Sequence, residues 1–256
     1  MAQENEKEIQ QLKNRFRDLA ERSYTQGIYT FTGFLGLGEQ EIFWQQEREL
    51  RHAGYALEGG WQEADRVVIR FGNETELGYQ VPFPITCIHI SPLQQKFADD
   101  LSHRDFLGAL MNLGIDRSTL GDIKVADREA YLFCLDSIAE FICENLTQIR
   151  HTHVHCAVTE DFTDIPQEEP EKVNIQVQSL RIDAVLSKVY NMSREKSLEL
   201  FRAGRVYVNG RLCGNNSRLL KAGETVNARG FGKFSLIGEP RETRKGKLAV
   251  ETAVYR

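Results

Sequence analysis

The feature that most restricts the fold of this 256-residue chain is a run of helix and turn signals in its C-terminal third. Two stretches with apolar residues at helical spacing lie on either side of Ser193, a residue type favoured at helix N-caps. Gly204 follows the second stretch, where a glycine in the left-handed conformation ends many helices. Asn209 and Gly210 then form the pair typical of a type I′ hairpin turn. The predicted order is therefore helix, helix and hairpin, with a further strand after Gly223.

The same segment, from Arg181 to Val226, resembles the S4 domain, an RNA-binding module named for a ribosomal protein. The residues that carry the resemblance are R-I-D-x-V-L, S-R-E-K-S, F-x-x-G-R-V-x-V-N-G and K-x-G-E-x-V in chain order. Two positions depart from the commonest pattern: Ile182 stands where leucine is usual, and Glu224 where aspartate is usual. Both changes are mild, so the resemblance implies an S4-type fold and RNA binding for this part of the chain.

Charge is divided unevenly along the chain. Residues 171–256 carry 17 lysines and arginines against 8 aspartates and glutamates, a net of +9, whereas residues 1–170 carry 15 against 29, a net of −14. A basic segment of this kind is typical of a polyanion-binding surface. Charge alone leaves two alternatives open, because the two parts could attract each other or the basic residues could form a solvated face. A further basic run near the C-terminus could contact phosphate or be an exposed hairpin, and consists of Arg241, Arg244, Lys245 and Lys247.

Basic residues in and around the two predicted helices are the candidate RNA contacts. A helix start combines free N–H groups with the positive end of the helix dipole, which favours anions. Guanidinium groups bind phosphate through two parallel hydrogen bonds, and Ser193 can donate to a phosphate as well as cap its helix. Each side chain alone could be merely solvated, but the resemblance to S4 domains favours the cluster as a site. The candidates are Arg181, Ser193, Arg194, Lys196, Arg202, Arg205 and Arg211.

The middle of the chain alternates between strand and helix periodicity. The order from Ile85 is β-α-β-β-α-β, which is the ferredoxin-like pattern that RRM-type RNA-binding domains share. Because many functions use this topology, it supports RNA binding only weakly. The strands are predicted at 85–90, 121–126, 130–135 and 150–158, and the helices at 102–113 and 137–146.

Two further helices are predicted ahead of this pattern, at 4–22 and 39–52, followed by a strand at 67–69. The acidic, proline-containing segment 160–172 is predicted to link the middle of the chain to its basic part. The predicted fold class is therefore α+β, with an N-terminal mostly helical region, a ferredoxin-like or RRM-like central domain and a C-terminal S4 domain with C-terminal strands. The predicted domain ranges are 1–64, 65–165 and 175–256.

A wider resemblance covers most of the chain. The segments Ala53–Gly60, His103–Gly114 and Gly121–Ile123 resemble the YlmH family, whose members join an N-terminal region and a central RRM-like domain to a C-terminal S4 domain. The run Gly33–Gln40 departs from that pattern, since a proline-containing turn is expected there. The resemblance implies binding to ribosomal RNA and tRNA on the large ribosomal subunit. It also implies a part in rescuing stalled ribosomes, including tailing of the stalled nascent chain.

Three motifs that suggest chemistry lack the required spacing. His103–Asp105 resembles a kinase catalytic loop, but position 110 is leucine where that loop needs asparagine. The glycines of Gly33–Gly38 are spaced G-x-x-G-x-G, which fits neither phosphate-loop fingerprint. Histidines alternate over residues 151–155 and should share one strand face, whereas zinc usually takes four ligands from separated segments. The sequence therefore predicts no catalytic residue, no cofactor and no metal.

The N-terminus is charged and has no apolar signal region, and no apolar run approaches the roughly 20 residues that span a bilayer. Five scattered cysteines without a C-x-x-C pair indicate reduced thiols. We therefore expect a cytoplasmic protein without a membrane partner, and we expect it to be a monomer.

Two other functions remain open. An RNA-modifying enzyme of the pseudouridine-synthase type, or an accessory to one, also carries an S4 domain. Such enzymes resemble one another in having a large catalytic domain after it, and too few residues follow Gly210 here. A protein adaptor, for instance in cell division, would use the acidic N-terminal two-thirds of the chain.

Overall fold

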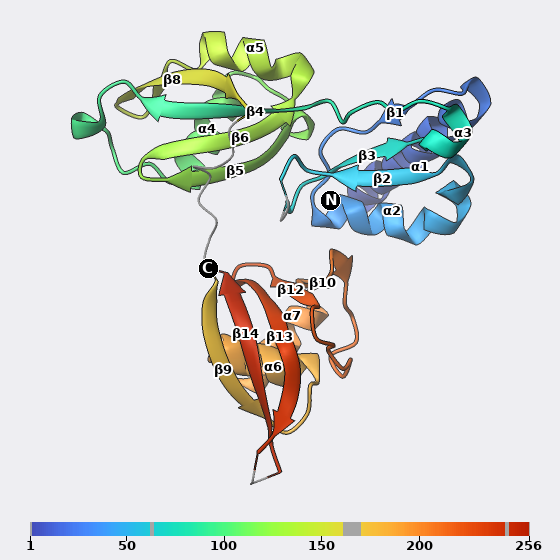
Figure 1. Cartoon of the computed structure of the whole chain (residues 1–256), viewed down its shortest axis with the longest axis vertical. Helices are drawn as coiled ribbons and strands as arrows, with labels where there is room; N and C mark the ends of the chain where they lie inside the picture. Colours follow the sequence, from blue (N-terminus) through green and yellow to red (C-terminus); the bar gives the residue numbers. More distant parts are fainter. Residues whose placement is uncertain (1, 62–63, 161–169, 244–245, 256) are drawn as a thin grey trace. The chain divides into compact units, whose positions relative to one another are not determined.

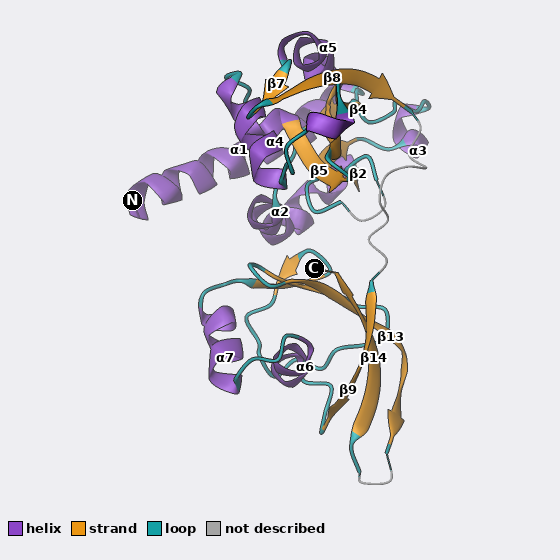
Figure 2. Cartoon of the chain, turned by 90° about the vertical axis from the view of Figure 1, so that its left-hand side faces the viewer, coloured by secondary structure: helices purple, strands orange, loops and turns teal. Residues whose placement is uncertain are grey.

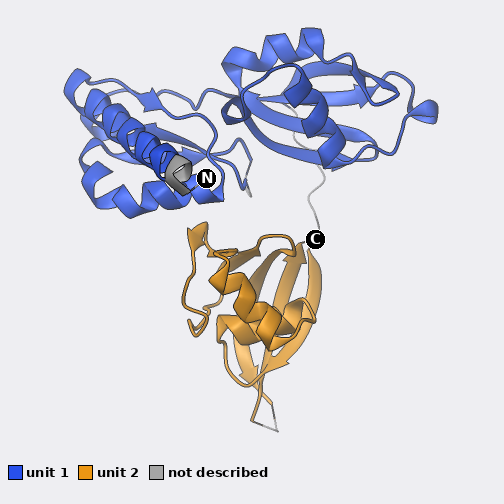
Figure 3. Cartoon of the chain, turned by 180° about the vertical axis from the view of Figure 1, so that it is seen from behind, with its two compact units in different colours: residues 1–166 blue, residues 167–256 orange. Residues whose placement is uncertain are grey.

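The computed structural model describes the chain over residues 2–61, 64–160, 170–243 and 246–255. The chain forms two compact units, residues 1–166 and residues 167–256, drawn in blue and orange in Figure 3. The described strands form three antiparallel sheets, and helices occur in both units, so the predicted α+β class is confirmed. Among the described helices, none combines the length and apolar character of a transmembrane span.

The N-terminal part of unit 1 packs two helices against a small sheet of order β1-β3-β2 (Figure 1). Phe16 of the first helix and Phe43 of the second meet edge to face in its core, with ring centroids 5.7 Å apart. The two helices lie where the sequence predicts them. The elements are α1 (Ala2–Gln26), β1 (Thr30–Phe31), α2 (Leu37–Leu50), the 3-10 turn η1 (Arg51–Ala53), β2 (Tyr55–Glu58), β3 (Val68–Phe71) and α3 (Glu74–Leu77).

Strand β3 corresponds to the strand predicted at 67–69, and its hydrogen-bonded partners are β1 and β2. The boundary predicted between residues 64 and 65 therefore falls between two paired strands of one sheet. Arg66, just before β3, donates hydrogen bonds to the carbonyl oxygens of Phe34, Arg117 and Leu120 at 3.0, 3.1 and 2.9 Å. This guanidinium ties the N-terminal part of the unit to its central part.

The central part of unit 1 is a sheet of order β5-β6-β4-β8-β7 with two helices on one face (Figure 1). Ile88 and Leu132 of the central strands are buried against Phe106 and Ile142 of the helices. The predicted β-α-β-β-α-β order is observed. The elements are β4 (Ile85–Pro92), η2 (Gln95–Phe97), α4 (His103–Asn112), η3 (Arg117–Thr119), β5 (Leu120–Ala126), β6 (Glu129–Leu135), α5 (Asp136–Asn145), β7 (Gln148–Ile149) and β8 (Thr152–Thr159).

The opposite face of this sheet is covered by the N-terminal part of the same unit. Cys87 of β4 and Phe133 of β6 pack there with Phe34 and Val68 in a separate buried cluster. Gly121 of β5 lies so close to Phe34 that a Cβ added to the glycine would be 2.7 Å from the ring. Strands β4 and β6 are therefore buried on both faces at these positions.

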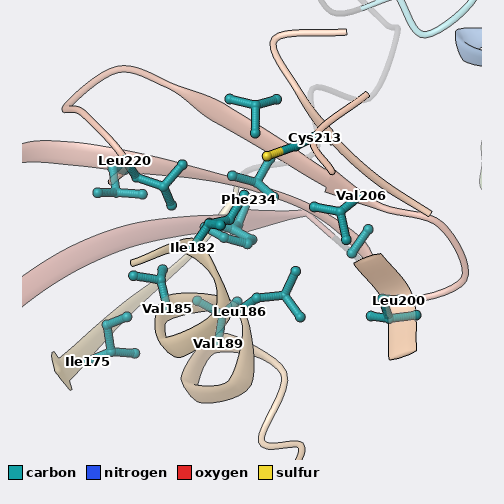
Figure 4. Packing of buried hydrophobic residues seen from close by; sticks show 14 of the residues in the cluster. Ile175, Ile182, Val185, Leu186, Val189, Leu200, Val206, Cys213, Leu220 and Phe234 are labelled. Carbon is teal, nitrogen blue, oxygen red and sulfur yellow. The ribbon is translucent and has the colours of Figure 1, made fainter. Parts of the chain in front are cut away.

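Unit 2 packs two helices against a six-stranded antiparallel sheet of order β11-β10-β12-β13-β14-β9 (Figure 2). Leu186 of α6 (Ile182–Val189) and Leu200 of α7 (Arg194–Arg202) belong to the same core as Phe234 of the sheet (Figure 4). The strands are β9 (Glu171–Val177), β10 (Val206–Val208), β11 (Arg211–Leu212), β12 (Thr225–Ala228), β13 (Gly232–Glu242) and β14 (Leu248–Tyr255).

The local signals of unit 2 are confirmed. Ser193 caps α7, because its Oγ accepts a hydrogen bond from the backbone N–H of Lys196 at 3.2 Å. Asn209 and Gly210 have φ angles of 50° and 76°, as a type I′ turn requires. Strand β9 differs from the prediction, which extends the linker to residue 172; this strand is held by its pairing with β14.

Candidate nucleic-acid interface

The start of α7 has the geometry predicted for an anion site. Arg194, Glu195 and Lys196 are exposed, and the N–H groups of the first two have no intrahelical acceptor. These N–H groups and the helix dipole would favour a phosphate there. The carboxylate of Glu195 lies in the same turn and would oppose it. Ser193 acts here as an acceptor for the backbone, so its observed role is that of the cap.

Arg194 and Lys196 lie on different sides of α7. Residues two apart on an α-helix point in directions about 200° apart. Lys196 extends toward the turn between β12 and β13, where its Nζ is 5.3 Å from the centroid of the Phe231 ring. The two cations, which lie in one helical turn, therefore belong to different parts of the surface.

The β12–β13 turn brings further basic and aromatic side chains beside Lys196. The N–H of Arg229 donates to the carbonyl oxygen of Arg205 at 2.9 Å, so the two arginines are neighbours. Gly230 lies against the Arg205 guanidinium, since a Cβ added to this glycine would be 3.0 Å from an Nη atom. The Arg229 guanidinium lies 5.0 Å from the centroid of the Tyr207 ring. We call the following four residues the turn surface: Lys196, Arg205, Arg229 and Phe231.

Two of the predicted RNA contacts, Lys196 and Arg205, belong to the turn surface. Arg229 and Phe231 are not among the residues that the sequence predicts, although an arginine and an aromatic residue flank a glycine there. The information that the sequence does not supply is strand register: β10 pairs with β12, which brings the start of the turn beside Arg205.

Arg181, predicted to open α6 as an RNA contact, is bound to Asp183. Its Nε and Nη2 lie 3.1 and 2.8 Å from the two carboxylate oxygens. Asp183 is 6% exposed, and it also accepts from Nδ2 of Asn216 at 3.2 Å and from the N–H of Ala184 at 2.8 Å. Burial acts to raise the pKa of Asp183, but the hydrogen bonds from Arg181 and Asn216 outweigh burial and lower this pKa. The charge of Arg181 is therefore partly balanced within the unit.

The start of α6 does not offer the free N–H groups that the sequence predicts there. The N–H groups of Ile182 and Asp183 donate to the carbonyl oxygens of Arg218 and Asn216, at 2.9 and 3.3 Å. The segment 216–218 therefore lies where an anion would bind at this helix start. For this reason the expectation of free N–H groups at the α6 start is wrong, whereas Arg181 stays a predicted RNA contact through its partly exposed side chain.

The other predicted residues lie elsewhere on unit 2. Arg202 is exposed in the last turn of α7, and Arg211 is exposed in β11, directly after the hairpin turn. In the second basic run, Arg241 belongs to β13 and Lys247 precedes its partner strand β14, so these two residues lie on a hairpin. The remaining members of that run lie outside the described residues: Arg244 and Lys245.

The central sheet of unit 1 does not expose its aromatic side chains on β6. RRM-type domains stack RNA bases on aromatic residues of the open sheet face. Here Tyr131 and Phe133 are 6% and 1% exposed, because the N-terminal part of the unit covers them. His89 stacks on Tyr131 with ring centroids 4.8 Å apart and contacts Glu129 at 2.7 Å. Base stacking of the RRM type is therefore blocked at these positions.

The histidines and cysteines of unit 1 are the residues in which metal binding or nucleophilic chemistry would be sought. His153 and His155 are exposed on β8 while Cys156 is buried, which is the predicted alternation, although Val158 near the strand end is exposed. Over the ranges that the structure describes, no three His, Cys, Asp or Glu side chains are grouped to hold a metal ion. Burial raises the pKa of three thiols to about 12, which makes them poor nucleophiles: Cys87, Cys134 and Cys156.

Residues 80–164, which include the central sheet of unit 1, match the family model described as "Putative RNA-binding domain in YlmH". The chain is also 31% identical over 202 residues to ribosome-associated protein quality control protein P2 of Bacillus subtilis (strain 168), a match that covers 77% of this chain and 76% of that protein. The chain belongs to the YlmH family. The solved structure of cell division protein ylmH from Streptococcus pneumoniae is similar to this YlmH-family chain with a TM-score of 0.48 and 19% identity, covering 62% of this chain and 95% of that one.

The resemblance to the YlmH family that the sequence predicts is thereby confirmed. The matched family model ends at residue 164, before unit 2 begins, so the turn surface lies outside the region that the model covers. A YlmH-family chain of this kind therefore has two candidate regions for RNA contact, one in each unit.

Proposed function

We propose that this YlmH-family protein binds RNA without catalysing a reaction. It acts on ribosomal RNA and tRNA at the large ribosomal subunit, in the rescue or quality control of stalled ribosomes. The Bacillus subtilis relative is by its name a ribosome-associated quality control protein. The observation that carries the proposal is the turn surface, which lies in a segment with a net charge of +9 over residues 171–256.

The chemistry of the turn surface suits RNA better than it suits a simple anion. The Lys196 ammonium lies over the Phe231 ring, and the Arg229 guanidinium lies over the Tyr207 ring. RNA loops present phosphate oxygens beside unstacked bases, which bind cations and aromatic faces respectively. The cations of the turn surface and the partly exposed ring of Phe231 therefore match both parts of a nucleotide, whereas Tyr207 is 4% exposed and supports Arg229 from below.

The proposal includes the domain assignment. An S4 domain at 175–256 is supported by two helices, the Ser193 cap and the type I′ hairpin. A ferredoxin-like or RRM-like domain within 65–165 is supported by the strand order β5-β6-β4-β8 with two helices on one face. The N-terminal region, 1–64, extends into β3 through its sheet. We place the protein in the cytoplasm, as a monomer.

Sedimentation of cell lysate tests the proposal. The wild-type chain should travel with large ribosomal subunits, and the double variant Arg205→Ala, Arg229→Ala should be shifted to the top of the gradient. The matched control is Arg48→Ala, which removes an exposed arginine from α2 in unit 1 and should leave the profile unchanged. A double variant that is folded and still travels with large subunits would contradict the turn surface as the RNA site.

Mass spectrometry of carbodiimide-treated RNA tests the absence of catalysis, because this reagent adds mass to pseudouridine, which otherwise has the same mass as uridine. Incubation of ribosomal RNA and tRNA with the purified chain should leave the masses of both the same as after incubation without it. Two carboxylates that invite a catalytic role are already engaged, since Asp105 accepts two hydrogen bonds from Ser102 and Asp183 binds Arg181. A reproducible change in RNA mass that depends on Asp105 or Asp183 would contradict this part of the proposal.

A further inference from the structure

Unit 1 contains a groove of about 480 Å³ with polar and apolar lining residues, between α4 and the segment that joins α5 to β8. One side of the groove is a single face of α4, because Arg104, Gly108 and Asn112 are spaced four residues apart on the helix. All three are exposed. The groove lies on the side of the sheet that the helices cover, so it is separate from the sheet face that the N-terminal part of the unit covers.

Gly108 has no internal reason to be a glycine. It lies in the interior of α4, where glycine costs about 1 kcal/mol relative to alanine. A Cβ added at this position would meet nothing within 4 Å, so no packing contact of the described residues requires its absence. The effect of the missing side chain is an open path to the helix backbone between Arg104 and Asn112. This leaves room for a close approach from outside the chain, which is one of the uses of glycine.

The opposite side of the groove carries carboxamides and a second guanidinium. Asn145 donates from Nδ2 to the carbonyl oxygen of Phe141 at 2.8 Å, and Gln148 donates from Nε2 to that of Arg150 at 2.8 Å. These hydrogen bonds use an NH2 donor of each amide and fix its orientation. The amide oxygens can still accept hydrogen bonds from a ligand. Arg150 has a side chain that is 55% exposed.

One carboxylate also lines the groove. Oδ1 of Asp105 is 3.7 Å from Nη1 of Arg150, which is a long ion pair. Its other oxygen, Oδ2, accepts from the N–H and the hydroxyl of Ser102 at 2.9 and 2.7 Å, so it serves the helix cap. Arg104 and Arg150 together therefore leave the groove with an excess of positive charge, although residues 1–170 as a whole carry −14.

We propose that this groove binds a single strand of RNA. Guanidinium groups bind phosphate oxygens, and the carboxamides of asparagine and glutamine pair with the donors and acceptors of base edges. Unpaired bases present those edges, whereas a duplex hides them and would bring many more phosphates near the acidic surface of unit 1. Glu140 and Glu144, both exposed on α5, add to the negative charge that would repel such a duplex. The groove is made of other residues than the turn surface and lies within the region that matches the YlmH family model; the inference rests on the proposed RNA-binding function and gives that region a specific site.

Methyl NMR spectroscopy of the full-length chain tests the proposal with a separate signal for each site. A mixed-sequence single-stranded RNA oligonucleotide should shift the methyl signals of Ala109, Leu113 and Leu146, which line the groove. Arg104→Ala should weaken the affinity measured from these signals about tenfold, as expected for one charge-assisted contact. Arg48→Ala, on α2, is the matched control and should change nothing.

Substitution of Gly108 separates a binding role from a structural one. Gly108→Ala should raise the thermal unfolding midpoint by about 2–4 °C, because alanine favours the helix and meets no neighbour. Gly108→Gln should preserve folding and abolish the methyl shifts in the groove, because its side chain fills the path to the backbone.

The outcomes divide clearly. Shifts confined to methyl groups of unit 2, such as those of Leu200, would leave the proposed function intact and overturn the groove. RNA-induced methyl shifts in the groove that persist in the Gly108→Gln variant would overturn the role given to Gly108 and thus the proposed site. Equal groove shifts from inorganic polyphosphate would show a response to charge alone and overturn the base-edge contacts. Groove shifts caused by a mixed-sequence peptide but not by RNA would show that the occupant is a protein segment, which also overturns the proposal.

Discussion

Replacement of Asp183 by asparagine tests whether a buried carboxylate fastens α6 to the segment 216–218. The carboxylate is 6% exposed and accepts from Asn216 and from the N–H of Ala184, besides its contact with Arg181. Asparagine has nearly the same shape, but it replaces one carboxylate oxygen, which accepts hydrogen bonds in the wild type, with an NH2 group that can only donate. A hydrogen bond to a buried charged group contributes about 1.5–3 kcal/mol, whereas the exposed partner Arg181 adds little because water screens it. Asp183→Asn should therefore lower the free energy of unfolding of unit 2 by about 2–3 kcal/mol.

The effect of Asp183→Asn should depend on pH in one direction. Hydrogen bonds from Arg181 and Asn216 keep the pKa of Asp183 in the folded chain below the ordinary value of 3.8. The ionised carboxylate therefore stabilises the fold above that value, and this stabilisation is lost as the pH falls through the lower pKa of the folded state. The difference in stability between wild type and variant should be complete at neutral pH and should shrink below about pH 4.

Urea unfolding followed by circular dichroism measures this difference. Both tryptophans of the chain, Trp44 and Trp61, lie in unit 1, so tryptophan fluorescence gives a separate signal in which no shift is expected. Glu239→Gln is the matched control, because it neutralises an exposed carboxylate on β13. A loss below about 0.5 kcal/mol at neutral pH, or a loss that persists unchanged at low pH, would refute the role given to Asp183.

Four further outcomes are expected. Arg194→Ala should weaken binding to large-subunit RNA about tenfold. It should also reduce the magnitude of the slope of log affinity against log salt by about 0.9, as for one lost phosphate contact. In the same titrations, the control Arg48→Ala should change neither quantity. Arg194→Lys should restore only part of the affinity, because an ammonium cannot make the bidentate contact. Arg66→Ala should destabilise unit 1 by about 2–4 kcal/mol in urea unfolding followed by tryptophan fluorescence, since three carbonyl oxygens lose their donor. Iodoacetamide labelling of the native chain at pH 8, read by mass spectrometry, should leave three thiols with raised pKa unmodified: Cys87, Cys134 and Cys156.

Local chemistry explains which parts of the fold were predictable. The Ser193 cap and the Asn209-Gly210 turn depend on residues within a few positions of each other, and both form as predicted. Strand β9 depends on β14, whose residues lie more than 70 positions further along the chain. Strand β1, the partner of the predicted strand β3, has only two residues and shows no periodicity of its own. Short strands, and strands whose partners are distant in the sequence, are therefore not predictable from local patterns.

The same distinction applies to the candidate site. Lys196 and Arg205 could be named because they belong to a string that resembles an RNA-binding module. Arg229 and Phe231 join them only through the register of β10 and β12. The sequence predicts Arg181 as a free cation because it does not reveal that Asp183 is buried beside this arginine.

The net charges of the two parts of the chain and the burial of the aromatic side chains on β6 indicate how a YlmH-family chain divides its contacts with RNA. Unit 2 lies in a segment of net charge +9, and cations that release counterions from phosphate supply affinity that falls as salt rises. Residues 1–170 carry −14 and the aromatic side chains of β6 are buried, so unit 1 cannot attract RNA from a distance or stack bases on that strand. Any contact made by unit 1 should therefore be local, and capture of the RNA by unit 2 would strengthen it. Rising salt should then act in opposite directions, weakening the phosphate contacts of unit 2 while screening the repulsion that unit 1 exerts.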